Sequence, residues 1–506
     1  MNSYSSSRAY RQPARRTRYQ SVIRWAMPAA PSAPISTNIP QRMDRLPWSR
    51  WHWLVVTALG VTWLLDGLEV SIVAALGPVL THTSTLHLTE SEVGLTASAY
   101  LAGSVLGAVV FSYLTDRQGR KKWFMITLLL YLAATVLTAF SWNLWSFMLF
   151  RFLTGAGIGG EYAAINSAID ELIPARWRGH TNLAINGSWW LGAAAGALLT
   201  IVLLNTHLIP EHLGWRLCFG LGAVLGVSIV LIRRLIPESP RWLMTHRRVE
   251  EAEAVVSSIE DQISREEGLA SLPKPEGSIT VHARPHVTLG TVARQLWNVY
   301  PRRTTLGIVL MTTQSFMYNA ISFTYPFVLT KFYDVPSSSI GLYILPFALG
   351  NFLGPLVLGR YFDTVGRKPM ISFTYAVAGC LLAVTGYLFW QDRFTSVTQT
   401  LAWSCVFFFA SAGASAAYLT VSEIFPLEIR AMAIAFFFVV AQGAGIVAPW
   451  LYGKLIESSA TSLFYGYLLG AGMMLVGALV ELFLGVKAEG RSLESIAAPL
   501  SAEKIQ

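Results

Sequence analysis

Four ionisable residues lie inside long apolar stretches of the N-terminal half of the sequence. Asp66 and Glu69 occur in LLDGLEV, and Arg151 and Glu161 occur in RFLTGAGIGGEY. A charge at the centre of a bilayer costs about 3 kcal/mol on insertion scales, so such residues are rare and usually functional. A carboxyl group that alternates between pairing with arginine and binding a proton can drive a change of conformation. We therefore predict that these four residues couple proton movement to another process.

Helix geometry predicts which of these residues meet. Asp66 and Glu69 are three residues apart and share one face of a helix. With a rise of about 1.5 Å per residue, Glu69 lies about 24 Å above the inner end of its span and Arg151 about 10 Å below the outer end, so the two depths are compatible. The open alternative to coupling is a static buried ion pair. Glu161, about 15 Å from Arg151, is either a proton station or substrate contact, or a structural carboxyl group held between helices.

The composition indicates a membrane protein. Apolar residues make up 53% of the chain, charged residues 13%, and the mean hydropathy is +0.47, which lies outside the range of ordinary soluble domains. Segments long enough to cross about 30 Å of hydrocarbon recur along the chain. They predict an all-α polytopic membrane protein with twelve transmembrane helices, at approximately residues 52–80, 93–114, 123–141, 144–169, 180–205, 214–233, 304–330, 338–359, 369–390, 397–421, 429–453 and 462–486.

Two loop motifs occur once in each half of the chain. The signature E-x-x-P-x-x-x-R starts at Glu171 and again at Glu423, and D-x-x-G-R-K starts at Asp116 and again at Asp363. We therefore expect the twelve helices to form two six-helix pseudo-repeats.

Lysine and arginine concentrate in alternate loops, which by the positive-inside rule places both termini and the central loop in the cytoplasm. The expected organisation is a basic disordered cytoplasmic tail (1–50), a six-helix bundle (51–233), a cytoplasmic loop (234–303), a second six-helix bundle (304–487) and a cytoplasmic tail (488–506). Met43 is a candidate translation start. The loop holds a stripe at helical spacing that predicts a short amphipathic helix: Val249, Ala252, Val255, Val256, Ile259 and Ile263.

Other kinds of chemistry have no support in the residue pattern. The three cysteines stand apart in hydrophobic runs, and the nine histidines show no pair at ligand spacing, so we predict no disulfide framework, metal or cofactor. No nucleophile and base are paired, so we predict that the protein is not an enzyme. The net charge of +9 follows the loops and does not indicate a nucleic-acid partner.

Several motifs together resemble the major facilitator superfamily. PESPRWL (237–243), QSFMYNA (314–320) and GRSLE (490–494) are similar to sugar-porter motifs, whereas GIGGEY (157–162) is more like the metabolite:proton symporters. The resemblance implies transport by alternating access, with Glu69 as the proton-coupling acid and Arg151 as its partner. Tyr418 stands where this family usually has tryptophan.

Amides and aromatic rings are the candidate substrate ligands. Gln314, Tyr318 and Tyr325 share one stripe of the seventh helix, and Asn319 joins them only if that helix is broken near Pro326, as the resemblance implies. Ligands of such transporters bind near the midplane, between the halves. A polar contact between helices is the alternative for each residue singly. The predicted substrate-binding residues are Asn182, Asn186, Trp189, Gln314, Tyr318, Asn319, Tyr325 and Tyr418.

Acid and arginine residues of the repeated motifs fall at predicted cytoplasmic helix ends. Arginine can bond a carboxylate in a bidentate manner, and pairs near the surface are individually weak. The resemblance implies a cytoplasmic gate that interlocks when the transporter faces outward; alternatively, the basic members only set orientation. The gate residues are Asp116, Arg120, Glu171, Arg178, Asp363, Arg367, Glu423 and Arg430. In the fourth helix Gly155, Gly157, Gly159 and Gly160 predict close approach to neighbouring helices.

These patterns predict a secondary active transporter of the cell membrane. The leading function is proton-coupled symport of a small polar organic metabolite, either sugar-like or an aromatic or other organic acid. Arg151 could bind a carboxylate directly, which would favour the acid. Proton-driven efflux of a drug or metabolite and a non-transporting solute sensor are the alternatives. The expected partners are the substrate, protons and the lipid bilayer, and we expect the protein to function as a monomer.

Overall fold

The computed structural model describes residues 35–233, 237–246, 248–269, 272–275, 279–281, 289–425 and 427–486, apart from some side chains within helices. In these ranges, twelve helices of 20 residues or more correspond to the twelve predicted spans. The predicted all-α polytopic fold is confirmed. The helices are α3 (Arg50–Leu76), α4 (Glu90–Gln118), α5 (Arg120–Ala139), α6 (Leu144–Leu172), α7 (Ala175–Leu203), α8 (Glu211–Arg233), α12 (Pro301–Tyr333), α13 (Ile340–Thr364), α14 (Arg367–Trp390), α15 (Ser396–Glu423), α16 (Leu427–Ser458) and α17 (Ala460–Leu484).

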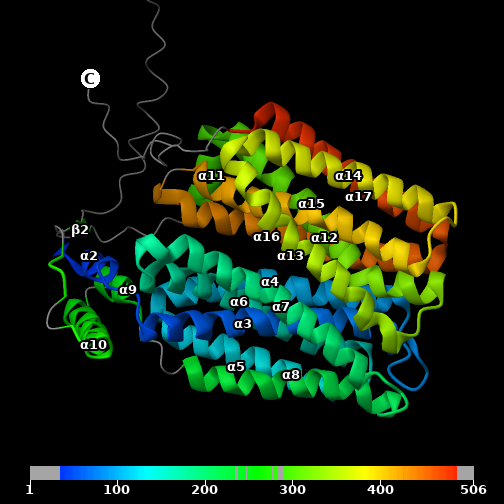
Figure 1. Ribbon diagram of the computed structural model, residues 1–506, viewed down its shortest axis with the longest axis horizontal. Coiled ribbons are helices and arrows are strands. Elements are labelled where there is room, and N and C mark those ends of the chain that lie inside the picture. The colour runs from blue at the N-terminus through cyan, green and yellow to red at the C-terminus, as the bar shows by residue number, and fades with distance from the viewer. Residues whose placement is uncertain are drawn as a thin grey trace, which may run out of the picture.

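The long helices form two halves that lie side by side, α3–α8 in one and α12–α17 in the other (Figure 1). In each half the first long helix packs on the fifth, and the second packs on the fourth. Between the halves α4 packs on α16, and α7 packs on α13. Because the second helix of each half meets the fifth helix of the other, the arrangement has the pseudo-symmetry that the repeated motifs predict.

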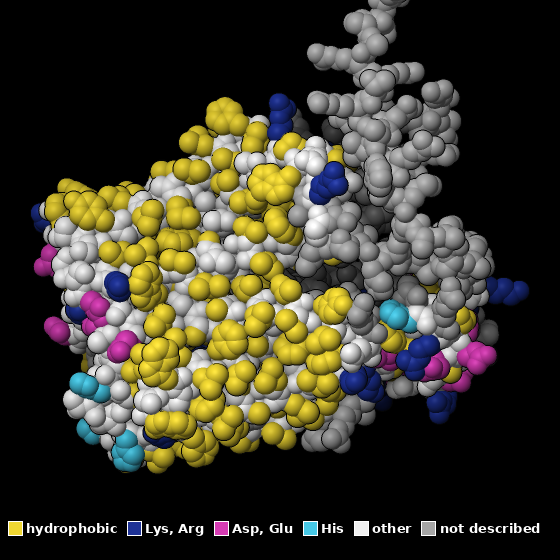
Figure 2. Space-filling model, turned by 180° about the vertical axis from the view of Figure 1, so that it is seen from behind, with side chains coloured by type: hydrophobic (Ala, Val, Ile, Leu, Met, Phe, Trp, Pro, Cys, Tyr) yellow, Lys and Arg dark blue, Asp and Glu magenta, His cyan; other side chains and the backbone are white. Residues whose placement is uncertain are grey.

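The flank of the bundle is apolar. Figure 2 shows hydrophobic side chains over this flank and charged side chains gathered at the two ends. Trp145 and Phe483 are among the large hydrophobic side chains exposed. Among the described residues, eight helices are long and apolar enough by length and composition to cross a membrane. Exposure of this kind suits a protein whose flank meets lipid.

A small group of elements lies at one end of the bundle. We call it the loop domain: strands β1 (Ile35–Thr37) and β2 (Ile279–Val281), which pair antiparallel, and helices α2 (Ile39–Asp44), α9 (Pro240–Thr245) and α10 (Val249–Glu267) (Figure 1). α11 (Leu289–Val299) precedes α12. The predicted amphipathic helix is confirmed as α10, whose buried face packs on α2 and α9.

Residues 35–50 differ from the prediction of a disordered tail. They form β1, α2 and the start of α3, with Ile39, Met43 and Leu46 buried in one hydrophobic cluster with α9 and α10. These three residues recur every three or four positions, so a short helix presents them on one face. For this segment the prediction of disorder is wrong; residues 1–34 lie outside the described part of the chain.

The two halves touch at the opposite end of the bundle, which carries the short helices η1 (Val79–Thr81) and η2 (Ser337–Ser339). There the Ser91 backbone N–H donates to Glu457 Oε1 at 2.8 Å, and Lys331 Nζ donates to Glu90 Oε1 at 3.2 Å. Gly94 packs so closely on α16 that an added Cβ would lie 2.4 Å from the Pro449 carbonyl oxygen. α4 is therefore joined to α12 and α16 at this end.

Candidate functional site

Backbone contact between α3 and α7 places the first pair of site residues. A Cβ added to Gly67 would lie 2.0 Å from the Trp189 carbonyl oxygen, and one added to Gly192 would lie 1.8 Å from the Leu64 carbonyl oxygen. Only glycine permits this approach. As a result, Asp66 on α3 lies directly beside Trp189 on α7.

The predicted close approach of α6 is confirmed by its glycines. A Cβ on Gly155 would lie 2.0 Å from the Tyr100 carbonyl oxygen of α4, and one on Gly159 would lie 2.0 Å from that of Ser104. Gly157 and Gly160 face α5 in the same way, against Thr127. This packing brings Arg151 and Glu161 of α6 into the interior of the first half.

Glu69 and Arg151 form an ion pair, as the predicted depths require. Arg151 Nη1 donates to Glu69 Oε1, and the Thr135 hydroxyl donates to Glu69 Oε2 at 3.4 Å. Arg151 is fully buried and Glu69 is 3% exposed. The Arg151 guanidinium carbon lies 4.5 Å from the centroid of the Tyr100 ring, within cation–π range. Arg151 Nε and Nη2 are buried without a hydrogen-bond partner, so the pair uses one of the three donor nitrogens.

Asp66 lies beside this pair but has different partners. Its Oδ2 accepts from Trp189 Nε1 at 2.7 Å, and its Oδ1 accepts from the Tyr100 hydroxyl at 3.3 Å. Glu161 is 4% exposed, and the charges of Glu69 and Glu161 both act on Asp66. We call Asp66, Glu69, Arg151 and Glu161 the acid cluster. The structure thus brings together the four residues that we predict to couple protons.

The second half contributes polar groups from α12. The Tyr318 hydroxyl donates to Asn351 Oδ1 at 2.7 Å, and Asn319 Nδ2 donates to the Ser315 carbonyl at 2.8 Å. Gln314 is 6% exposed and makes no hydrogen bond among the described residues. α12 runs unbroken through Pro326, so the expected break does not occur and Asn319 bonds to its own helix.

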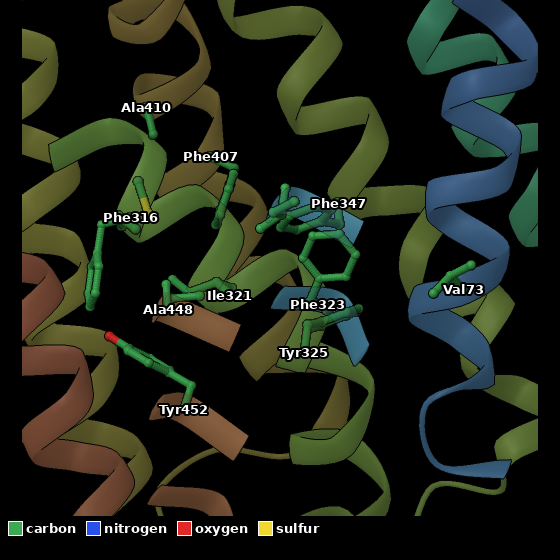
Figure 3. Packing of buried hydrophobic residues seen from close by; sticks show 14 of the residues in the cluster. Val73, Phe316, Ile321, Phe323, Tyr325, Phe347, Phe407, Ala410, Ala448 and Tyr452 are labelled. Atoms are coloured by element: carbon green, nitrogen blue, oxygen red, sulfur yellow. The ribbon is translucent and has the colours of Figure 1, made fainter. Parts of the chain in front are cut away.

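Tyr325 points into the second half rather than toward the acid cluster. Its hydroxyl donates to the Tyr343 carbonyl at 2.6 Å, and its ring stacks on Phe347 at 5.5 Å. Figure 3 shows Tyr325 near Phe347 on the second half, and Val73 on the separate helix α3. These contacts assign Tyr325 a packing role. Tyr418 on α15 is half-buried.

Trp190 is a site residue that the sequence pattern missed. Its ring lies 4.5 Å from Trp189 and 6.4 Å from Tyr318, centroid to centroid, so it contacts the second half from α7. Its neighbour in sequence, Trp189, shares one face of an ideal helix with Asn182 and Asn186, at spacings of four and three residues, and Trp190 does not. Two adjacent tryptophans near the middle of an apolar segment are the sequence feature that could have indicated Trp190 as a site residue.

Much of the predicted gate lies outside the described side chains. This is the case for Asp116, Glu171, Arg178, Asp363, Glu423 and Arg430, and also for the pocket residues Asn182 and Asn186. Arg120 and Arg367 are described, and they begin α5 and α14 directly after Gly119 (φ +107°) and Gly366 (φ +112°). The positive φ explains the glycine of the repeated motif.

Glu238 of the PESPRWL segment is a further residue at this end of the bundle. Its Oε1 accepts the backbone N–H groups of Arg120 at 3.0 Å and Lys121 at 3.2 Å. A carboxylate at a helix N-terminus is favoured by the helix dipole. The loop domain is thereby attached to the start of α5.

A cavity of about 430 Å³ opens at the η1 end, far along the bundle from the loop domain. Residues of both halves line it, among them Val79, His82 and Glu211 from the first and Thr330 and Asp334 from the second. None of the predicted substrate-binding residues lines this cavity. We therefore centre the candidate site on the acid cluster and α12 instead.

Comparison with known families now identifies the chain. The profile of the family described as "Sugar (and other) transporter" matches residues 68–499. The chain belongs to this family. It is a multi-pass transporter of the major facilitator superfamily, as its motifs and its two six-helix halves predict.

Relatives within the sugar (and other) transporter family cover nearly the whole chain. The niacin transporter NiaP of Acinetobacter baylyi is 28% identical over 91% of this chain and 99% of that protein. Myo-inositol transporter 2 of Schizosaccharomyces pombe is 26% identical over 88% of this chain and 81% of that protein. The solved D-xylose-proton symporter shares the fold with a TM-score of 0.69, at 19% identity over 87% of this chain and 99% of that one.

Proposed function

We propose that the protein is a proton-coupled symporter that moves a small polar ring compound across the cell membrane by alternating access. The observation that carries the proposal is the charge balance of the acid cluster. Asp66 and Glu69 share the interior of the first half; Arg151 pairs with Glu69, whereas the partners of Asp66 are the neutral donors Trp189 and Tyr100. Burying a carboxylate without a cation beside it is costly, so Asp66 and Glu69 together favour the uptake of a proton.

The Glu69–Arg151 pair is suited to opening and closing. A pair at about 4 Å is worth roughly 4 kcal/mol at an effective dielectric constant of 20, and protonation of Glu69 removes this attraction. The pair has one hydrogen bond and a weak second ligand in Thr135, while two donor nitrogens of Arg151 have no partner. Protonation would therefore release Arg151 and change the packing of α3 against α6.

The same proposal assigns a direction to the two ends. Basic loops favour the cytoplasm for the loop domain and both termini, which leaves the η1 end outside. Contacts between Glu90 and Lys331 and between Ser91 and Glu457 hold the two halves together at the η1 end, so we assign this arrangement to the inward-facing state. Arg120, Arg367 and the remaining gate residues would close the other end in the outward-facing state.

The relatives guide the choice of substrates for a test. Their printed names include niacin, myo-inositol and D-xylose. Purified protein in liposomes that contain a pH dye should acidify the lumen when one of these compounds is added outside. Glu69→Gln should abolish acidification while leaving exchange of the substrate across the membrane, because the site is intact but uncoupled.

Glu481→Gln is the matched control, since Glu481 is equally buried but lies on α17 in the second half. It should acidify the lumen as the wild type does. Equal proton movement in Glu69→Gln and wild type would refute coupling through Glu69. Dissipation of a preset proton gradient by drugs alone would instead establish efflux.

A further inference from the structure

We infer that Asp66 and Trp190 determine substrate specificity: the site accepts a neutral or positively charged ring compound that donates hydrogen bonds, and it rejects carboxylate anions. This inference rests on the proposed function and names the substrate class of the same site. It assigns Asp66 to the substrate rather than to the proton pathway alone.

The charged groups of the acid cluster differ in their exposure. Arg151 is fully buried and Glu69 is 3% exposed, whereas Asp66 is only half-buried. The Tyr100 ring covers the Arg151 guanidinium, and Glu69 occupies one of its nitrogens. Asp66 is thus the member of the acid cluster with the most remaining exposure, and we assign the contact with the substrate to it rather than to Arg151.

Asp66 has hydrogen-bonding capacity left for a ligand. Each carboxylate oxygen can accept two hydrogen bonds. Oδ1 accepts one from Tyr100 and Oδ2 accepts one from Trp189. Both partners are rigid aromatic side chains that hold the carboxyl group in one orientation, and each oxygen keeps one position for a donor on the substrate.

Aromatic side chains of the first half contact aromatic side chains of α12. Trp190 approaches Tyr318 at 6.4 Å, and Tyr100 approaches Phe323 at 6.5 Å, each pair joining the first half to α12. Aromatic faces attract cations and stack on rings. Two such pairs beside one carboxyl group suit a ring that carries a positive charge or several hydroxyl groups.

A side-chain amide on α12 is also without a hydrogen-bond partner among the described residues. Gln314 is 94% buried, since its exposed fraction is 6%, and it makes no hydrogen bond among the described residues. It lies one helical turn from Tyr318, on the same face of α12. Its amide atoms are not among the fully buried polar atoms that lack a partner, so they keep some exposure and a ligand with donor and acceptor groups can bind them.

The charges of the acid cluster oppose an anion. A carboxylate at this position would meet the carboxyl group of Asp66, and the positive charge of Arg151 is already paired with Glu69. The hypothesis that Arg151 binds the carboxylate of an organic acid therefore has no support in this geometry.

Two series of compounds, each on one ring, test the inference. The first is nicotinate, nicotinamide and 1-methylnicotinamide, and the second is D-glucuronate, D-glucose and D-glucosamine; each runs from anion to neutral form to cation. Binding is measured by the rise in melting temperature of the detergent-solubilised full chain with ligand concentration. In the series that binds, we expect the neutral and cationic members to bind at least about tenfold more tightly than the anion.

Asp66→Asn should lower the affinity for the cation by about tenfold and change that for the neutral member by less than about threefold. Asp66→Glu should restore the preference for the cation, which a purely structural role would not produce. Trp190→Ala should weaken the neutral and cationic members of the binding series together, and Trp190→Phe should preserve them.

An anion that binds best to the wild type, an order of affinities unchanged in Asp66→Asn, or no binding in either series would overturn the inference. The symport proposal fails on a different result, namely equal proton movement in wild type and Glu69→Gln. Glu69→Gln should keep the order of affinities while losing proton movement, so the two failures are distinguishable.

Discussion

Arg42 of α2 bonds to α10 within the loop domain, and its removal should loosen α10. Its guanidinium group donates to Glu260 at 3.0 Å and 2.6 Å and to the Ser257 hydroxyl at 3.1 Å, and it also pairs with Glu253. Arg42→Met would keep most of the apolar stem and remove these bonds. Glu260 would keep its second ion-pair partner, Arg45, whose Nη2 lies 2.5 Å from Glu260 Oε1.

The burial of the Arg42–Glu260 pair sets the loss of stability that we expect in Arg42→Met. The side chains of Arg42 and Glu260 are 13% and 12% exposed, so the pair lies between exposed pairs, worth about 0–1 kcal/mol, and buried pairs, whose breakage costs about 3–5 kcal/mol. We expect a loss of about 2 kcal/mol of local stability, which corresponds to an increase of roughly 30-fold in amide exchange.

Hydrogen exchange of the full chain in detergent measures this effect, with the amides of α10 as the readout. Arg248→Met is the matched control, because Arg248 pairs with Glu251 on the same helix but both side chains are about half exposed, at 49% and 56%. It should change exchange less than about threefold. Equal changes in the two variants, or unchanged exchange in Arg42→Met, would refute the assignment of stability to this contact.

The same contact should make the loop domain sensitive to acid. Burial alone would raise the pKa of the Glu260 carboxyl group, but hydrogen bonds from Arg42 and Arg45 outweigh it and the pKa is lowered. An acid with a lowered folded pKa stabilises above its unfolded value, near 4.3, and loses that stabilisation as the pH falls through the folded value. The protection of the α10 amides, measured relative to their intrinsic exchange rates at each pH, should therefore fall below about pH 4, and less so in Arg42→Met.

Three further substitutions test the packing. Gly192→Leu should prevent folding or lower the melting temperature sharply, because even a Cβ would lie 1.8 Å from the Leu64 carbonyl oxygen; a normal melting curve would contradict the α3–α7 contact. Glu481→Met should raise stability by about 1–3 kcal/mol, since Glu481 is fully buried and neither of its carboxyl oxygens has a partner; an unchanged denaturation midpoint would count against this. Tyr325→Phe should cost about 1 kcal/mol by removing the bond to the Tyr343 carbonyl, with no change in substrate KM; a raised KM would return Tyr325 to the substrate site.

The helical spans and the Glu69–Arg151 pair could be predicted from residue types and spacing. A helix of known rise crosses a layer of known thickness, so the depth of each residue follows from its distance along the chain. The repeated loop motifs added the two-fold organisation without any contact being known. The paired depths of Glu69 and Arg151 were enough to expect the ion pair that the structure contains.

The spacing of residues along the sequence does not determine how each helix is rotated about its own axis. Tyr325 shares a stripe with Gln314 on an ideal helix, yet Tyr325 bonds to α13, because the packing of whole helices decides what lies opposite each point of a stripe. Trp190 contacts Tyr318 for the same reason, since α7 is drawn onto α3 at Gly192 and toward the second half.

The amino-acid sequence alone therefore determined the class of protein, its spans, its repeat and the residues that could bind protons. Tertiary structure decided that Arg151 is fully buried while Asp66 keeps partial exposure, and that residues 35–46 pair with β2 and pack on α9 and α10. The physical reason is that hydropathy and helical rise are local properties of the chain. In contrast, the exposure of a side chain and the identity of its partners depend on how distant segments pack together. Small residues decide which surfaces of those segments can come into contact.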